Sequence, residues 1–206
     1  MSSRPLIHVV DDDESLRKAL LRLLAAAGFE ARGYSSTGDF LLNPPPDRPG
    51  CLLLDIHMPG PSGLDLQEAL RSRGITLPIV FLTGHADVAS SVRAMKAGAV
   101  DFLMKPVKRD TLLDALERAL ERDALQRAAR WEEDRLRALF VSLTAREREV
   151  FDHIVAGKLN KQIADELGVA ERTVKLQRAQ VMTKLGAGSA AELGRLAERL
   201  RRLPDK

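Results

Sequence analysis

Five short strand-like segments, each followed by a segment with helical spacing, constrain the fold of the first 120 residues most strongly. Most of them are continuous apolar runs, which are typical of strands buried on both faces of a parallel sheet. Strands alternating with helices predict an α/β fold, a doubly wound five-stranded parallel sheet. The segments are Leu6–Val10, Glu30–Tyr34, Cys51–Leu54, Ile79–Leu82 and Val100–Leu103.

Helical patterns follow these segments, and the last of them is unusually long. From residue 109 to residue 139 the chain has no Gly or Pro, so we expect the last helix of the sheet domain to continue as a long helical linker. Apolar residues recur along it at spacings of three and four, which fits either a coiled-coil dimer or packing on the protein's own domains; the polar Asp123 weakens the coiled-coil pattern. The expected stripe is Leu113, Leu116, Leu120, Ala124, Ala128 and Trp131.

Residues 143–206 differ from the rest in charge and in pattern. They carry 13 Lys and Arg against 9 Asp and Glu, whereas residues 1–120 carry 14 against 15. A basic C-terminal third indicates an anionic partner for that part of the chain. Helical spacing without strand-like alternation predicts an all-α domain, with a capping box at Thr144 and Glu147 and with Gly157, Gly168 and Gly186 between helices.

Composition also indicates the cellular compartment in which we expect the protein to act. The single cysteine, Cys51, lies in an apolar run, and we expect it to be a buried strand residue in a reducing cytoplasm. No apolar run reaches about 18 residues, so we expect no membrane partner. The first residues lead directly into a strand-like segment without a signal-peptide pattern.

Polar residues follow four of the expected strands, at the end of the sheet where such folds bind ligands. Asp11 and Asp12 follow the first strand, Asp55 the third, Thr83 the fourth and Lys105 the fifth. Clustered carboxylates repel one another unless a cation lies among them, and Mg²⁺ prefers such oxygen ligands. A carboxylate can also attack a phosphoryl group, with the ammonium, the hydroxyl and the metal neutralising charge.

The motifs VVDDDES, LLLDIHMPGPSGLDL, IVFLTGH and MKAGAVDFLMKP, in this order, closely resemble the CheY-like receiver domain of two-component response regulators. The resemblance covers roughly residues 5–122. It implies that Asp55 accepts a phosphoryl group from a sensor histidine kinase, and that Lys105 and Thr83 contact that group. It also implies direct Mg²⁺ ligation by Asp12, Asp55 and the backbone carbonyl of His57, with Asp11 acting through water.

Three further expectations come from the same resemblance. The bond between Lys105 and Pro106 should be cis, which is uncommon even before proline. Phe102 occupies the position of the aromatic residue that turns inward when Thr83 moves. The side chain of His57 has no expected role, and the other histidines show no metal-like spacing, so we do not expect a zinc site.

The segment LTAREREVFDHIVAGKLNKQIADELGVAERTVKLQRAQVMTKLG resembles the four-helix, helix-turn-helix domain of the NarL/FixJ (LuxR-type) regulators. A helix near residues 161–167 and a second over residues 171–185 fit a DNA-reading pair, whose second helix enters the major groove. Gln177 departs from the family's usual His. A final helix near residues 189–203 would pair two DNA-bound copies. The expected DNA contacts are Asn160, Lys161, Arg172, Thr173, Lys175, Leu176 and Arg178.

Together these features predict a phosphorylation-dependent transcriptional regulator rather than a turnover enzyme. We expect a receiver over residues 1–122, a helical linker over 123–142 and a DNA-binding domain over 143–206, with a homodimer forming on phosphorylation or on DNA. A second hypothesis is a phosphatase with an aspartyl-phosphate intermediate, but that chemistry needs an acid where His57 stands. A third is an RNA-binding receiver protein, and a fourth is a basic helical bundle that binds no nucleic acid.

Overall fold

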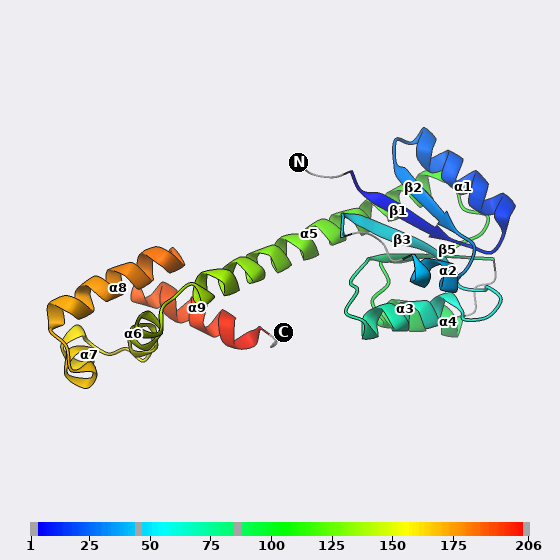
Figure 1. The fold of residues 1–206 in the computed structure, drawn as a ribbon. Coiled ribbons are helices and arrows are strands. Elements are labelled where there is room, and N and C mark those ends of the chain that lie inside the picture. The colour runs from blue at the N-terminus through cyan, green and yellow to red at the C-terminus, as the bar shows by residue number, and fades with distance from the viewer. Residues whose placement is uncertain (1–3, 44–46, 85–87, 204–206) are drawn as a thin grey trace. The chain divides into compact units, whose positions relative to one another are not determined.

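A computed structural model describes residues 4–43, 47–84 and 88–203. The chain forms two compact units, Met1–Arg127 and Ala128–Lys206, and helix α5 runs from the first into the second (Figure 1).

The first unit contains a five-stranded sheet of order β2-β1-β3-β4-β5, in which all neighbouring strands are parallel. This confirms the predicted fold class. Strand order reverses between β1 and β3, so the carboxyl ends of these two strands mark the place where doubly wound sheets bind ligands. The strands are β1 (Leu6–Val10), β2 (Glu30–Tyr34), β3 (Gly50–Asp55), β4 (Ile79–Thr83) and β5 (Asp101–Met104).

Alternate side chains of the central strands enter two separate cores, because successive side chains of a strand point to opposite faces. On β3, Cys51 and Leu53 pack in one core with α1 and α5, whereas Leu52 and Leu54 pack in the other with α2, α3 and α4. Both faces of β3 are therefore buried, as its continuous apolar run predicts, and Cys51 is fully buried.

Helices of the first unit begin at recognisable caps. Asp13 accepts hydrogen bonds from the backbone of Ser15 and Leu16 and starts α1, while Ser62 and Asp65 form a capping box at α3.

In the described part of the chain, no helix is long and apolar enough to cross a membrane. The helices are α1 (Glu14–Ala26), α2 (Thr37–Leu42), α3 (Gly63–Ser72), α4 (Val88–Lys96) and α5 (Arg109–Val141).

The buried face of α5 coincides with the expected stripe only in its first half. Of that stripe only Leu116 is fully buried, while Ala124, Ala128 and Trp131 are exposed, Trp131 to 62%. Leucine and alanine occur on several sides of this helix, so spacing alone did not identify the whole face that packs. The residues of α5 that are buried in the core are Leu112, Ala115, Leu116 and Ala119, and Leu113 and Leu120 of the expected stripe pack against it, partly buried.

Asp123 continues this buried face, one turn beyond Ala119, and is only 1% exposed. Its Oδ2 accepts hydrogen bonds from the backbone N–H of Gly50 at 3.0 Å and from Nε of Arg127 at 2.9 Å. Arg127 also donates to Asp47 at 2.7 Å and to the carbonyl oxygen of Arg48 at 2.5 Å. A buried carboxylate thus ties α5 to the residues that lead into β3, a role that the sequence analysis missed.

The second unit is all helical, as predicted, and its helices share one core. Val150, Ile154, Ile163, Val174 and Leu193 are among its most buried side chains. The capping box at the start of α6 is present as expected, and both α7 and α8 end at glycines with left-handed backbone. The helices are α6 (Ala145–Val155), α7 (Asn160–Leu167), α8 (Glu171–Leu185) and α9 (Ala190–Arg202).

Candidate functional site

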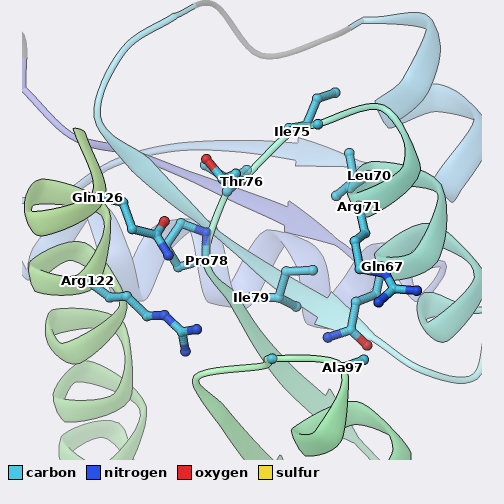
Figure 2. Close-up of a pocket in the computed structure, with 13 residues that line it drawn as sticks. Gln67, Leu70, Arg71, Ile75, Thr76, Pro78, Ile79, Ala97, Arg122 and Gln126 are labelled. Atoms are coloured by element: carbon cyan, nitrogen blue, oxygen red, sulfur yellow. The ribbon is translucent and has the colours of Figure 1, made fainter. Parts of the chain in front are cut away.

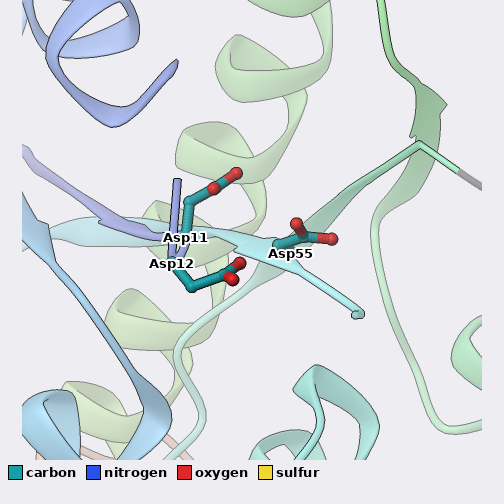
Figure 3. A group of neighbouring side chains, drawn as sticks. All are labelled: Asp11, Asp12 and Asp55. Carbon is teal, nitrogen blue, oxygen red and sulfur yellow. The ribbon is translucent and has the colours of Figure 1, made fainter. Parts of the chain in front are cut away.

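Three carboxylates gather where the strand order reverses (Figure 3). Asp11 and Asp12 directly follow β1, and Asp55 is the last residue of β3. One oxygen from each side chain lies within 4.8 Å of the other two. Asp11 and Asp55 are buried, whereas Asp12 is exposed, so the cluster is accessible from one side.

Lys105 bridges two of these carboxylates from the end of β5. Its Nζ donates to Oδ2 of Asp55 at 2.6 Å and to Oδ2 of Asp11 at 2.7 Å. The following peptide bond, between Lys105 and Pro106, is cis as expected. Three carboxylates and one ammonium leave the cluster net negative, which favours a divalent cation and opposes an apolar ligand.

Burial and neighbouring charges shift the pKa values of Asp11 and Lys105 in opposite directions. Burial raises the pKa of the Asp11 carboxyl above its usual range, although the hydrogen bond from Lys105 opposes the rise. Burial alone would lower the pKa of the Lys105 ammonium, but its bonds to Asp11 and Asp55 outweigh this effect and raise that pKa. Lys105 therefore stays charged at neutral pH.

Thr83 ends β4 beside this cluster and is fully buried. Its Oγ1 lies 3.0 Å from Nδ1 of His57, a hydrogen bond between the two side chains. The backbone N–H of His57 donates to Oδ1 of Asp55 at 3.1 Å. Phe102 lies two residues before the end of β5 and packs, partly buried, against the core that contains Phe81. The contact between His57 and Thr83 was not foreseen from the sequence, where only the His57 carbonyl was implicated.

Gly63, at the start of α3, lies directly against the backbone of Asp55. A Cβ atom at this glycine would stand 2.2 Å from the Asp55 carbonyl oxygen, so no other residue fits without moving that strand end. Its N–H donates to the carbonyl oxygen of Ile56 at 3.0 Å. The glycine of the PSGLDL motif therefore serves to hold the loop after Asp55 close to α3.

In the second unit, one side of α8 presents exposed polar and basic side chains. Arg172, Thr173, Lys175 and Leu176 are exposed, Leu176 to 61%, while Val174 faces the core. The expected contact residues in the first half of α8 are thus free to meet a partner surface. Lys161, near the start of α7, is exposed as well.

Two further expected contact residues bind each other. Nη1 of Arg178 donates to Oδ1 of Asn160 at 3.3 Å, which joins α8 to the start of α7. Both line a shallow hollow together with Lys158. Gln177 is partly buried, and its Oε1 accepts no hydrogen bond from the described residues. The hollow combines positive charge with a helix start, an arrangement that suits a phosphate group.

An internal ion pair stabilises the second unit and was not recognised from the sequence. Glu147, 5% exposed, accepts from the backbone of Thr144 at 2.8 Å and from Nζ of Lys184 at 2.7 Å. The hydrogen bond from Lys184 lowers the pKa of the Glu147 carboxyl below its usual range. Glu147 therefore connects the start of α6 to the end of α8, beyond its predicted role in the capping box.

A separate cavity of about 190 Å³ lies at the opposite end of β4 from Thr83 (Figure 2). Its lining includes Gln67, Arg71, Pro78 and Arg122. Both arginines are exposed, and Arg71 forms an ion pair with Glu68 at 3.0 Å. This cavity is distant from the carboxylates and has no part in their chemistry.

Two family models match the chain. The response regulator receiver domain matches residues 7–117, and the family described as bacterial regulatory proteins, luxR family, matches residues 141–197.

Relatives resemble the chain over nearly its whole length. Nodulation protein W of Bradyrhizobium diazoefficiens is 45% identical, over 97% of this chain and 88% of that protein. The transcriptional regulatory protein FixJ of Rhizobium meliloti is 41% identical, over 93% of this chain and 94% of that protein. The response regulator protein TodT of Pseudomonas putida is 40% identical, over 98% and 89%.

Solved structures agree with these similarities. The response regulator StyR superimposes with a TM-score of 0.86 at 48% identity, covering 96% of this chain and all of that one. Full-length FixJ from B. japonicum gives a TM-score of 0.59 at 38% identity, covering 98% of this chain and all of that one. Receiver motifs, a luxR-type helical domain and relatives that share both lead to one conclusion. The chain belongs to the NarL/FixJ family of two-component response regulators, which regulate transcription in dependence on phosphorylation.

Proposed function

We propose that Asp55 accepts a phosphoryl group from a sensor histidine kinase, and that this event controls the binding of residues 143–206 to promoter DNA. The observation that carries the proposal is the position of the Lys105 ammonium, within 2.7 Å of both Asp11 and Asp55. A carboxylate at the open end of a parallel sheet is thereby placed next to a cation, a buried hydroxyl and two further carboxylates. This set matches the needs of phosphoryl transfer.

The residues at this site fit Mg²⁺. The donors are all oxygens, they come from three carboxylates, and they lie within 4.8 Å of one another. Asp12 and Asp55 would hold the ion directly with the His57 carbonyl, and Asp11 would act through water. When bound, Mg²⁺ supplies positive charge that offsets the charge of the carboxylates and of the incoming phosphoryl group.

The transfer itself needs a nucleophile and neutralised charge. An Asp55 carboxylate oxygen attacks the phosphorus atom, the new O–P bond forms as the P–N bond of the kinase phosphohistidine breaks, and the bonding pair returns to the imidazole nitrogen. The Lys105 ammonium, already in contact with Asp55, then pairs with a phosphoryl oxygen. The Thr83 hydroxyl donates a hydrogen bond to another phosphoryl oxygen, and Phe102 repacks as Thr83 moves.

We assign the three parts of the chain as a receiver over residues 1–122, a connecting helix over 123–142 and a DNA-binding domain over 143–206. Along the chain, the first compact unit ends at Arg127 and the second begins at Ala128, and this boundary lies inside the proposed connecting helix. The family matches end and begin on either side of it, at residues 117 and 141. A regulator that binds promoter DNA acts in the cytoplasm of its cell.

For the DNA interface, α8 would enter the major groove with its first half against the bases, and the start of α7 would contact a phosphate. Exposure of four side chains on α8 and the basic hollow near Lys158 support this arrangement. Two copies would bind as a homodimer, because paired half-sites require two reading helices. The proposed contacts are Asn160, Lys161, Arg172, Thr173, Lys175, Leu176 and Arg178.

Phosphoryl uptake tests the first half of the proposal. The full chain is incubated with Mg²⁺ and acetyl phosphate, and its intact mass and its oligomeric state are measured together. We expect a mass gain of one phosphoryl group that is absent in Asp55→Asn and is accompanied by dimerisation. Continued uptake by Asp55→Asn would overturn the assignment of Asp55. Repeated hydrolysis of phosphate esters would favour a phosphatase instead.

DNA binding tests the second half. A duplex selected by the protein from a random pool serves as the probe in gel-shift titrations at several salt concentrations. Lys175→Ala should weaken binding and reduce the salt dependence by about one released ion, whereas Lys18→Ala, an exposed lysine paired with Glu14, should change neither. Equal loss in both variants, or binding to single-stranded RNA alone, would contradict the assignment of α8.

A further inference from the structure

The imidazole of His57 lies between solvent and the hydroxyl of Thr83. His57 is exposed, Thr83 is fully buried, and Nδ1 of the ring stands 3.0 Å from Oγ1 of the threonine. His57 also lines the open pocket over the phosphoacceptor site, together with Asp55, Gly84 and Lys105. The ring therefore contacts the hydroxyl that the phosphorylated state would need.

The backbone holds this ring in place. The N–H of His57 donates to Oδ1 of Asp55 at 3.1 Å, and the neighbours of His57 on both sides, Ile56 and Met58, are buried. A side chain attached to so fixed a backbone loses little further freedom when it bonds Thr83, so the hydrogen bond keeps most of its strength.

A phosphoryl group on Asp55 would compete for this hydrogen bond. A threonine hydroxyl has one hydrogen to donate. When Nδ1 accepts that hydrogen, the hydroxyl can donate it to a phosphoryl oxygen on Asp55 only by giving up the bond to His57. The competition therefore belongs to the tautomer in which Nδ1 accepts the hydroxyl hydrogen.

We infer that the His57 side chain is a positioning residue that latches Thr83 in the resting state and so weakens the response of the receiver to a phosphoryl group. The inference rests on the proposed role of Asp55 and adds a residue that sets the threshold of the switch. A ligand shifts a two-state equilibrium only by its difference in affinity for the two states. Loss of a bond made only in the resting state therefore tightens binding to the active one.

The test uses beryllofluoride, a phosphoryl mimic, titrated into the full chain at saturating Mg²⁺. Binding is followed through the backbone amide signals of Thr83 and Gly84 in nuclear magnetic resonance spectra. In His57→Leu the apparent affinity should rise about threefold to tenfold, the range that one ordinary hydrogen bond corresponds to. In His57→Asn, which keeps a polar atom at the position of Nδ1, the affinity should stay near that of the unmodified protein.

A double-mutant cycle with Thr83→Ala separates the latch from a general effect on folding. In the Thr83→Ala background, His57→Leu should no longer change the affinity, because the hydroxyl on which the latch acts is gone. An unchanged affinity in His57→Leu, or the same gain with and without the Thr83 hydroxyl, would overturn the latch. If the unmodified protein itself binds no beryllofluoride, the proposed function of Asp55 fails instead, so the two failures are distinguishable.

Discussion

At the scale of single residues, the site depends on Lys105. Its ammonium is the group that offsets the charges of Asp11 and Asp55, and it holds them within 2.7 Å of one nitrogen. A buried carboxylate that loses its cation partner becomes easier to protonate and less nucleophilic. The same ammonium is also placed to stabilise charge that develops on a transferring phosphoryl group.

Lys105→Met should therefore slow phosphorylation of Asp55 by acetyl phosphate about 100-fold, the lower end of the loss for one preorganised donor. Methionine keeps the length of the side chain and removes its charge. The rate is measured from intact mass against time at saturating Mg²⁺. Lys108→Met, an exposed lysine three residues later, is the control and should react at the original rate; an equal rate for Lys105→Met would contradict the role of Lys105.

His8 gives the fold a pH dependence of its own. It is 1% exposed in β1, its Nδ1 lies 2.9 Å from the hydroxyl of Tyr34, and burial, aided by the charges of Arg32 and Arg48, lowers its pKa from 6.5 to about 4. Between these values the unfolded chain binds the proton and the folded protein does not. Stability from neutral His8 is thus fully present above pH 6.5 and is lost as the pH falls toward 4.

We expect the free energy of unfolding to fall by about 2 kcal/mol more in the unmodified protein than in His8→Gln when the pH drops from 7 to 5. Urea unfolding at the two pH values, followed by circular dichroism, measures both slopes. The comparison of slopes removes the carboxylates, which titrate alike in the two proteins. Parallel pH dependence in the two proteins would show that His8 is protonated in the fold.

Sequence reasoning located residues that follow strands but not the contacts made by their side chains. Asp11, Asp12, Asp55 and Lys105 meet because parallel strands end at one edge, a consequence of topology alone. The bond between His57 and Thr83 depends on side-chain direction across two neighbouring strand ends, which spacing along the chain does not encode.

At the scale of elements, β3 carries the phosphoacceptor candidate and is bonded to α5. Asp55 is at the carboxyl end of β3, and Gly50, at its other end, donates its N–H to the buried Asp123 of α5. All five strands were predicted; continuous buried runs mark β1, β3 and β4, whereas β2 is polar and only partly buried. The expected stripe on α5 was right for Leu113, Leu116 and Leu120 and wrong beyond them, because the residue that continues the buried face, Asp123, is polar and its partner lies 73 positions away.

Asp123→Ala should lower the free energy of unfolding by about 2–3 kcal/mol, since it leaves the buried Gly50 N–H without its acceptor and removes one of the three acceptors of the Arg127 guanidinium. Urea unfolding of the full chain gives this value. Glu121→Ala, an exposed acid on the same helix, serves as the control and should cost less than about 0.5 kcal/mol. Equal effects from the two variants would mean that Asp123 does not anchor α5.

At the scale of the whole molecule, one helix joins two units with different charge and chemistry. The first unit carries the carboxylate site, and the basic second unit carries the exposed side of α8. The relatives share both parts. In the proposed function the two parts are coupled, so that phosphorylation of Asp55 changes the affinity of α8 for DNA. The coupling free energy equals the difference between the DNA-binding free energies of the two phosphorylation states.

The most direct test is therefore the DNA affinity of the full chain before and after treatment with acetyl phosphate and Mg²⁺. The unmodified protein and Asp55→Asn are titrated in parallel against the same selected duplex. We expect phosphorylation to tighten binding by about tenfold or more, a coupling of about 1.4 kcal/mol or above, in the unmodified protein only. An unchanged affinity after verified phosphorylation, or an equal gain in Asp55→Asn, would contradict the claim that Asp55 controls the DNA-binding unit.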